Sequence, residues 1–337
     1  MNTQNPNSHL LLTGAGFTSN FGGLLGRDVW ARLFNRVSGN TLLRDLLYSE
    51  DSFEAAFTKA ISGSYPDAVK QEMTAALLAV FRELDDIVRN WTWNPGSAYP
   101  VNEYRIRQLI DRFSGARSER SGFFFTVNQD LFVERMYYPD PRVVRLEIPG
   151  IENPSRLPLF EPHFRSVEVQ EREYLVVPEG QMSEPGMDGK IGYYYVKLHG
   201  SFGWKSADGV VPMVIGEGKE DAIRGNQLLR WYFSTFEAAI SAGSRKLLIV
   251  GYGFGDTHIN RVIGKAVNEA DLKLAIMTRD RTKLLGDLRK RDDCEGILKG
   301  LRYIYEQPLR EIYPADQRFT PADEAFQREF FGSVIRR

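Results

Sequence analysis

Four short clusters of glycine and polar residues each follow a short apolar run, and together they hold residue types that bind nucleotides and move protons. Glycine lets the backbone approach a phosphate closely. A histidine titrates near neutrality and is suited to general base catalysis, although a solitary histidine is more often structural. The clusters are Gly14-Ala15-Gly16, Thr126-Val127-Asn128-Gln129-Asp130, Lys197-Leu198-His199-Gly200-Ser201 and Gly251-Tyr252-Gly253-Phe254-Gly255-Asp256.

The first cluster is the start of a glycine-rich segment, Thr13 to Gly23, that directly follows the apolar run Leu10-Leu11-Leu12. Backbone N–H groups in such a turn, polarised by a following helix N-terminus, can hold a phosphate. The segment therefore predicts a cradle for a dinucleotide pyrophosphate. The alternative is a purely structural turn, because the spacing is not a clean G-x-G-x-x-G.

The elements that position these clusters are short apolar strands separated by helical stretches. Besides the run at Leu10, we expect strands at Phe123–Phe125, Tyr193–Val196, Leu247–Val250 and Leu272–Met277. Apolar strands that alternate with helices predict an α/β fold in which a Rossmann-like, doubly wound parallel sheet is covered on both faces. Polar groups at the carboxyl ends of such strands meet where open α/β sheets bind ligands.

Two long stretches interrupt this pattern, and a third segment closes the chain. Residues 36–116 have helical periodicity and are too long for a simple crossover, so we expect a helical insertion. Residues 139–192 are rich in Pro, Gly and Glu and predict a small, partly β insertion. Thr320-Pro321-Ala322-Asp323 has the form of a helix start and predicts a C-terminal helix within 318–337. We therefore expect residues 1–337 to form a single, enlarged domain.

The amino-acid composition argues against several classes of function. The 43 Lys+Arg residues nearly balance the 44 Asp+Glu, so overall charge does not favour direct nucleic-acid binding or an anionic membrane. No apolar run approaches the roughly 18 residues of a membrane span, and no signal-peptide pattern precedes the first strand. The single cysteine, Cys294, excludes an intrachain disulfide and a cysteine-rich zinc site. We therefore expect a cytoplasmic protein without a membrane partner.

The four clusters, in this order, resemble the motifs of sirtuins. The stretch Thr126 to Arg135 is similar to the sirtuin run Thr-x-Asn-x-Asp-x-x-x-Glu-Arg, and Leu198-His199-Gly200 is similar to the sirtuin histidine motif. Sirtuin deacylases usually carry a four-cysteine zinc module, which this chain lacks, and their Gly-Ile-Pro-Asp-Phe-Arg motif is replaced by Gly22-Gly23-Leu24-Leu25-Gly26-Arg27-Asp28. The last glycine motif looks like that of bacterial sirtuin-like effectors of anti-phage defence.

The resemblance implies an NAD hydrolase, an NAD nucleosidase that releases nicotinamide and ADP-ribose and defends bacteria by depleting NAD. NAD would be the substrate and no metal would be needed. Asn128 would orient the nicotinamide ribose and a water, Asp130 would support nicotinamide, and His199 would be the general base. The residues that the resemblance implies for NAD binding are Gly14, Ala15, Gly16, Phe17, Thr126, Gly251, Tyr252, Gly253 and Asp256.

Simpler roles compete with several of these. Asn128 could cap an Asx-type turn. Asp256 could N-cap a helix that begins near Thr257, with His258 exposed in its first turn, and from the residues alone we favour this interpretation.

Alternatives to hydrolysis are an NAD-dependent protein deacylase and a non-catalytic NAD or ADP-ribose sensing module that regulates a partner. By resemblance to such effectors, we expect a homo-oligomer activated by a separately encoded partner, for which a HerA-type hexameric ATPase is one candidate.

Overall fold

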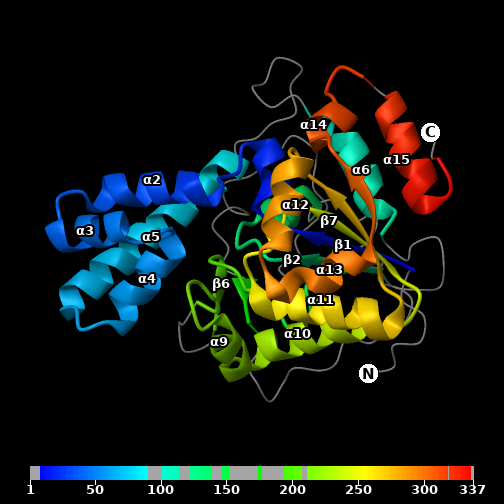
Figure 1. Ribbon diagram of the computed structural model, residues 1–337. Coiled ribbons are helices and arrows are strands. Elements are labelled where there is room, and N and C mark those ends of the chain that lie inside the picture. Colours follow the sequence, from blue (N-terminus) through cyan, green and yellow to red (C-terminus); the bar gives the residue numbers. More distant parts are fainter. Residues whose placement is uncertain are drawn as a thin grey trace.

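The computed structural model describes residues 8–89, 101–113, 122–137, 146–151, 174–176, 193–206, 211–317 and 319–334. Within these residues the protein is an α/β fold around a seven-stranded sheet with the strand order β3-β5-β2-β1-β7-β8-β9. Every neighbouring pair is parallel, as predicted (Figure 1). The strands are β1 (His9–Thr13), β2 (Gly122–Thr126), β3 (Leu146–Glu147), β5 (Tyr193–Lys197), β7 (Lys246–Val250), β8 (Lys273–Met277) and β9 (Leu301–Tyr305).

Strand residues alternate between two buried layers, which explains why the strands read as continuous apolar runs. Leu11 and Leu248 lie in one core layer, whereas Leu10, Leu12 and Ile249 lie in the other. Helices cover both faces, so each side chain of a central strand meets an apolar layer. The second layer is closed by α10 (Gln227–Ile240), α11 (Thr257–Ala270) and α13 (Glu295–Gly300).

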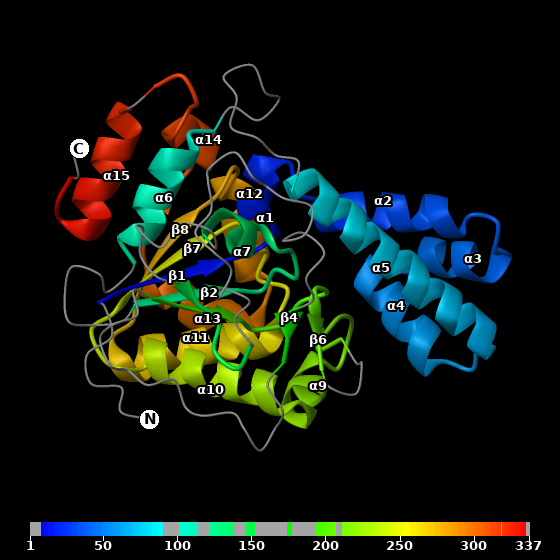
Figure 2. The same cartoon turned by 180° about the vertical axis from the view of Figure 1, so that it is seen from behind.

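The opposite face is covered by α6 (Glu103–Asp111), α14 (Leu309–Ile312) and α15 (Pro321–Phe331), which Figure 2 shows beside one another. The C-terminal helix begins as predicted, because the Thr320 hydroxyl accepts a hydrogen bond from the Asp323 N–H at 3.1 Å and Pro321 occupies the first helical position. Phe326 and Phe330 then pack into the core.

A helical lobe, α2–α5, projects from one end of the sheet (Figures 1 and 2). It begins at Gly26, ten residues before the start expected for the insertion. The later helix of that stretch, α6, lies against the sheet instead of in the lobe. The lobe helices are α2 (Gly26–Val37), α3 (Thr41–Ser49), α4 (Phe53–Ser62) and α5 (Asp67–Arg89).

The stretch 139–192 lies largely outside the described residues. Its described parts include β3 and β4 (Tyr174–Leu175), and β4 pairs with β6 (Trp204–Lys205) in a separate two-stranded sheet. The connection from β6 to β7 contains α9 (Lys219–Gly225) before α10. Among the described residues no helix combines the length and the hydropathy that a membrane crossing requires.

The strands that follow β1 in the chain are placed first on one side of it in the sheet and later on the other side. From β1 the chain continues to β2, and later strands β7, β8 and β9 follow one another on the other side of β1. The carboxyl ends of β1 and β7 therefore flank the point where the strand order reverses. In open parallel sheets this is the point where a ligand crevice forms.

Candidate functional site

A cavity of about 660 Å³ lies at this reversal point, within the size range of small-molecule sites. Its lining brings together all four clusters of the sequence. Asn128 and Asp130 come from the end of β2, and His199 follows β5. The lining residues from the two glycine turns are Gly14, Ala15, Gly16, Val250, Gly251, Tyr252, Gly253, Phe254, Gly255 and Asp256.

The glycines of the first turn serve close packing of two backbones. A Cβ on Gly14 would lie 2.7 Å from the Gly251 oxygen, and one on Gly16 would lie 2.7 Å from the Gly251 Cα. The Gly16 N–H also donates to the Gly251 carbonyl at 2.9 Å. The helix that follows, α1 (Ala15–Thr18), is a single turn. The turn after β1, which was expected to bind a phosphate, therefore mainly packs its backbone against the turn after β7.

The later glycines of the second turn leave open space. A Cβ on Gly253 or Gly255 would meet nothing within 4 Å, and both residues line the cavity. Gly251 itself adopts a φ of +67° and could not carry a Cβ, which would lie 2.2 Å from the Phe17 nitrogen. Of the two glycine turns, the one after β7 therefore offers the accessible backbone.

Two residues expected among the NAD-binding set do not line the cavity. Phe17 is 1% exposed and its ring packs against Phe21, Phe124 and Phe132 in the core. The Thr126 hydroxyl is buried and hydrogen-bonds to Thr13, and it accepts the Asn128 N–H at 3.1 Å. Both side chains are buried in the protein interior, so they support the cavity wall from behind without lining it.

Asn128 and Asp130 differ in how freely they face the cavity. The Asn128 amide donates a long hydrogen bond of 3.4 Å to the Thr18 hydroxyl. The Asp130 carboxylate accepts the Phe132 N–H at 3.0 Å and so holds the start of α7 (Phe132–Tyr137). Burial raises the pKa of Asp130. The Asp130 carboxylate is therefore partly engaged by the backbone, while Asn128 retains side-chain capacity for a ligand. Both residues line the cavity, and the role of Asp130 toward nicotinamide stays a prediction.

A buried ion pair lies beneath these residues. The Lys197 ammonium is 2.9 Å from the Glu134 carboxylate, and both side chains are fully buried. Lys197 also donates to the Asp130 carbonyl. Burial raises the pKa of Glu134, and the Lys197 ammonium opposes this effect. The pair fixes α7, which directly follows the segment with Asn128 and Asp130, to the last residue of β5, two residues before His199.

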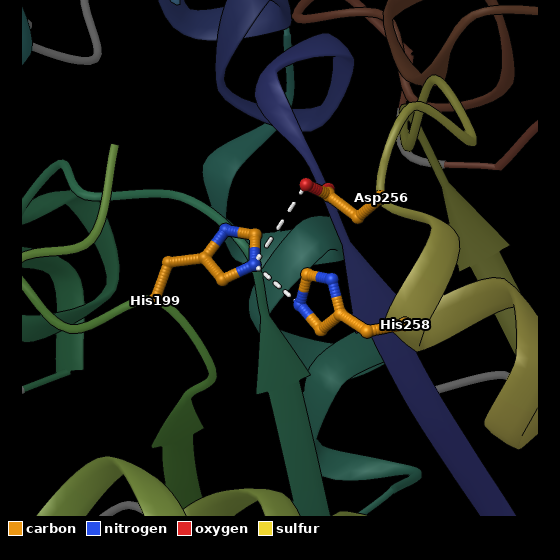
Figure 3. Close-up of side chains that lie close together, drawn as sticks. All are labelled: His199, Asp256 and His258. Atoms are coloured by element: carbon orange, nitrogen blue, oxygen red, sulfur yellow. Dashed lines mark hydrogen bonds and ion pairs between the residues drawn. The ribbon is translucent and has the colours of Figure 1, made fainter. Parts of the chain in front are cut away.

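Three side chains point toward one another, His199, Asp256 and His258 (Figure 3), and of these His199 and Asp256 line the cavity. The Nε2 atoms of the two histidines are 3.2 Å apart, and His199 Nε2 lies 3.8 Å from an Asp256 oxygen. His258 is only 8% exposed, so the expectation that it lies exposed in the first turn of α11 was wrong. It is covered because the Phe233 ring of α10 packs 5.6 Å from its ring.

Asp256 occupies the N-cap position of α11, as the residues alone suggested, but its carboxylate makes no cap hydrogen bond. The carboxylate instead lies 2.8 Å from the Lys219 ammonium. Burial opposes ionisation of Asp256, but the Lys219 ammonium, which donates a hydrogen bond to the carboxylate, holds its pKa below the usual range. Asp256 is therefore an ionised wall residue of the cavity.

The protonation state of His199 follows from its surroundings. Burial opposes protonation, whereas the Asp256 carboxylate and a backbone hydrogen bond at Val127 favour it. The Nε2 atom lies 3.2 Å from His258 Nε2 and 3.8 Å from an Asp256 oxygen. Burial lowers the pKa of His199 to about 3, so the imidazole is neutral at pH 7.

The cations around the cavity were not identified from the sequence. Arg279 follows β8 and lines the cavity, and burial together with the positive Arg310 and Arg27 lowers its pKa. The rule that locates ligands at strand ends could have found it, since Thr278-Arg279-Asp280 directly follows the predicted strand Leu272–Met277. The other cationic lining residues are Lys219, Lys283 and Arg291.

Comparison with known proteins gives no assignment, since no family model and no curated protein matches this chain.

Proposed function

We propose that the protein hydrolyses NAD to nicotinamide and ADP-ribose. The observation that carries the proposal is the meeting of Asn128, His199 and an open glycine turn in one cavity bordered by cations. The chemistry fits a dinucleotide, because backbone N–H groups and cations bind pyrophosphate while an amide and an imidazole serve the ribose. The motif resemblance to sirtuin-like hydrolases supports the same assignment.

In this mechanism the His199 Nε2 lone pair accepts a proton from a ribose hydroxyl or from the attacking water. Asn128 orients that ribose and the water near the anomeric carbon. Cleavage of the bond to a cationic leaving group passes through an oxocarbenium-like transition state, and the ionised Asp256 carboxylate near the base favours positive charge there. With a pKa of about 3, His199 is unprotonated at physiological pH but weakly basic, so its uptake of a proton depends on the Asp256 carboxylate, 3.8 Å away, to stabilise the imidazolium that forms.

The cationic residues that line the cavity would bind the phosphates of NAD. Arg279 lies near two other arginines, and an anion placed among them would relieve their mutual repulsion. Gly253 and Gly255 provide backbone that a pyrophosphate can approach. Thus NAD phosphates would lie toward β7 and β8, and the nicotinamide ribose toward Asn128 and His199.

By the same resemblance, hydrolysis would deplete cellular NAD during anti-phage defence, in a homo-oligomer activated by a separately encoded partner such as a HerA-type ATPase. The projecting lobe α2–α5 offers a surface for such assembly (Figure 1). Analytical ultracentrifugation of the chain alone and with the product of a neighbouring gene tests this. A monomer under both conditions contradicts it.

The activity test measures nicotinamide release from NAD by the full chain, alone and with the candidate partner. Asn128→Ala and His199→Gln should abolish release, whereas Asn268→Ala, an exposed position on α11, should not. Full activity in both site variants contradicts the proposal. Release that requires an acylated peptide would indicate a deacylase, and tight NAD binding without release under every condition would indicate a sensing module.

A further inference from the structure

We propose that His199, His258 and Asp256 form a binding site for a divalent transition-metal cation of the Zn²⁺ type, which inhibits the enzyme when bound. Each residue offers one ligand atom, and these atoms all lie within 4.8 Å of one another. Two imidazole nitrogens and a carboxylate oxygen are a ligand set that such cations accept in catalytic sites. The proposal of inhibition rests on the proposed function, whereas the proposal of binding does not.

The distances suit a tetrahedral cation. Zn–N bonds of about 2.0–2.1 Å at tetrahedral angles separate two nitrogens by about 3.3–3.4 Å. The His199 and His258 nitrogens are 3.2 Å apart, and the Asp256 oxygen is 3.8 Å from His199 Nε2. The two imidazole nitrogens are therefore already close to the required separation, and the Asp256 carboxylate would have to move toward them by about half an ångström or more. Figure 3 shows the three side chains converging from two separate segments, the turn after β5 and the start of α11.

The hydrogen bonding of His199 also fits a metal ligand. Its Nε2 is the atom that contacts both partner side chains, His258 and Asp256, and a backbone hydrogen bond at Val127 also involves the ring. A ligating histidine usually donates its other ring N–H to a carbonyl or carboxylate, which fixes the ring and raises its basicity. His258 would have to present its own Nε2 lone pair, and the present contact between two neutral rings would then be replaced by two bonds to the cation.

Lys219 is the internal competitor for this site. Its ammonium lies 2.8 Å from the Asp256 oxygen, where it neutralises the carboxylate that a cation would need. The same ammonium lies 2.7 Å from Glu54 on the lobe helix α4. Lys219 can therefore release Asp256 and keep one ionic partner. Metal and Lys219 are alternative occupants of the Asp256 carboxylate, so removal of the ammonium should strengthen metal binding.

A bound metal would affect activity because it would use the same His199 Nε2 lone pair that the proposed general base needs. His199 and Asp256 line the cavity, so a fourth metal ligand would be water or a group of the substrate. A bound cation takes the Nε2 electrons that His199 needs as a general base. Hydrolysis should therefore stop when the site is occupied and recover when a chelator removes the cation.

The test is a titration of the full chain with Co²⁺, followed by visible absorption of the bound ion, with Zn²⁺ added afterwards as a competitor. His258→Gln and Asp256→Asn should weaken Co²⁺ binding by more than about tenfold, since even outer-shell partners contribute about 10–100-fold. Lys219→Met should tighten it by about tenfold, because it removes a like charge a few ångströms away. The control His9→Gln, at the start of β1, should bind as the unmodified chain does.

Equal Co²⁺ affinity in the unmodified chain and His258→Gln would overturn the site, as would an absence of binding in both the unmodified chain and Lys219→Met. Binding is measured without NAD, so a failure of NAD hydrolysis leaves this readout intact. Conversely, an active enzyme that Zn²⁺ does not inhibit at concentrations saturating the Co²⁺ site would overturn the inhibition.

Discussion

Glu54 and Lys219 join the projecting helical lobe to the wall of the cavity through an ion pair of 2.7 Å. Glu54 lies on α4, and Lys219 is the first residue of α9. Because Lys219 also contacts Asp256, the lobe is one ionic contact removed from the residues around His199. A displacement of the lobe that withdraws Glu54 would therefore leave Lys219 with Asp256, the carboxylate next to the proposed general base, as its remaining ionic partner.

Substitution of the two carboxylates around Lys219 should be strongly non-additive. Glu54→Gln alone should lower the free energy of unfolding by less than about 1 kcal/mol, because Glu54 is partly exposed and Lys219 keeps Asp256. The double variant with Asp256→Asn leaves a largely buried ammonium without either partner, and the loss should exceed the sum of the single losses by about 1–3 kcal/mol. Urea unfolding of all four chains gives the coupling energy. Additive losses would show that the ammonium does not depend on this pair.

The glycines of the turn after β7 should separate into structural and binding positions. Gly251→Ala places a Cβ against the Phe17 nitrogen at a φ of +67°, so it should prevent folding or lower thermal stability severely. Gly253→Ala is its matched control, because a Cβ there meets nothing within 4 Å. It should leave the melting temperature unchanged and weaken NAD binding measured by calorimetry. A stable Gly251→Ala protein would contradict the close packing of the Gly251 backbone against Phe17.

Arg279→Gln should raise KM for NAD with little change in kcat, because the guanidinium would bind phosphate in both the ground state and the transition state. Arg281→Gln is the control, since Arg281 is exposed and faces Glu306 outside the cavity lining. Steady-state kinetics of nicotinamide release distinguishes the two. A fall in kcat at constant KM for Arg279→Gln would contradict a binding role.

Stability should fall as the pH is lowered below about 6.5. Burial, together with the Lys246 charge, lowers the pKa of His9 to about 4, and burial lowers that of His199 to about 3. Between these values and about 6.5 the unfolded chain binds protons that the folded chain excludes. The free energy of unfolding therefore decreases as the pH falls. Each residue should account for about 2 kcal/mol between neutral pH and pH 5.

Urea midpoints at pH 7.5 and pH 5 measure this slope, which His9→Gln and His199→Gln should each reduce. At position 9 glutamine can still donate a hydrogen bond to the Phe330 carbonyl, so that neutral contact is preserved while titration is lost. Equal midpoints at the two pH values in the unmodified chain would contradict the shifts.

A buried ion pair fixes α6 to the C-terminal helix. The Arg105 guanidinium and the Asp323 carboxylate are 2% and 1% exposed, and the guanidinium also lies 4.5 Å from the Phe319 ring centroid. Arg105→Met should reduce the free energy of unfolding by about 3–5 kcal/mol, because it leaves an unpaired buried carboxylate. The exposed control Arg302→Met should change it by less than about 0.5 kcal/mol. A loss below about 1 kcal/mol for Arg105→Met would contradict this role of the pair.

Apolar runs and strand-end rules predicted the central sheet and the meeting of Asn128, His199 and the glycine turns. The edge strand β9 was not predicted, since Arg302 and Tyr303 are exposed and its pattern is not a continuous apolar run. The burial of His258 and the role of Lys219 depend on contacts with α10 and α4. Such contacts between distant segments leave no local periodicity in the sequence.

The pairing of β1 with β7 joins His9 to Lys246 across most of the chain, whereas β7, β8 and β9 form from one continuous stretch. Contacts close in sequence form readily, and distant ones must overcome a larger loss of chain entropy. We therefore expect the β7–β9 half to fold first and β1 to dock late. The cavity lies on that last seam, so under the proposed function a nascent or partly folded chain would not yet hydrolyse NAD.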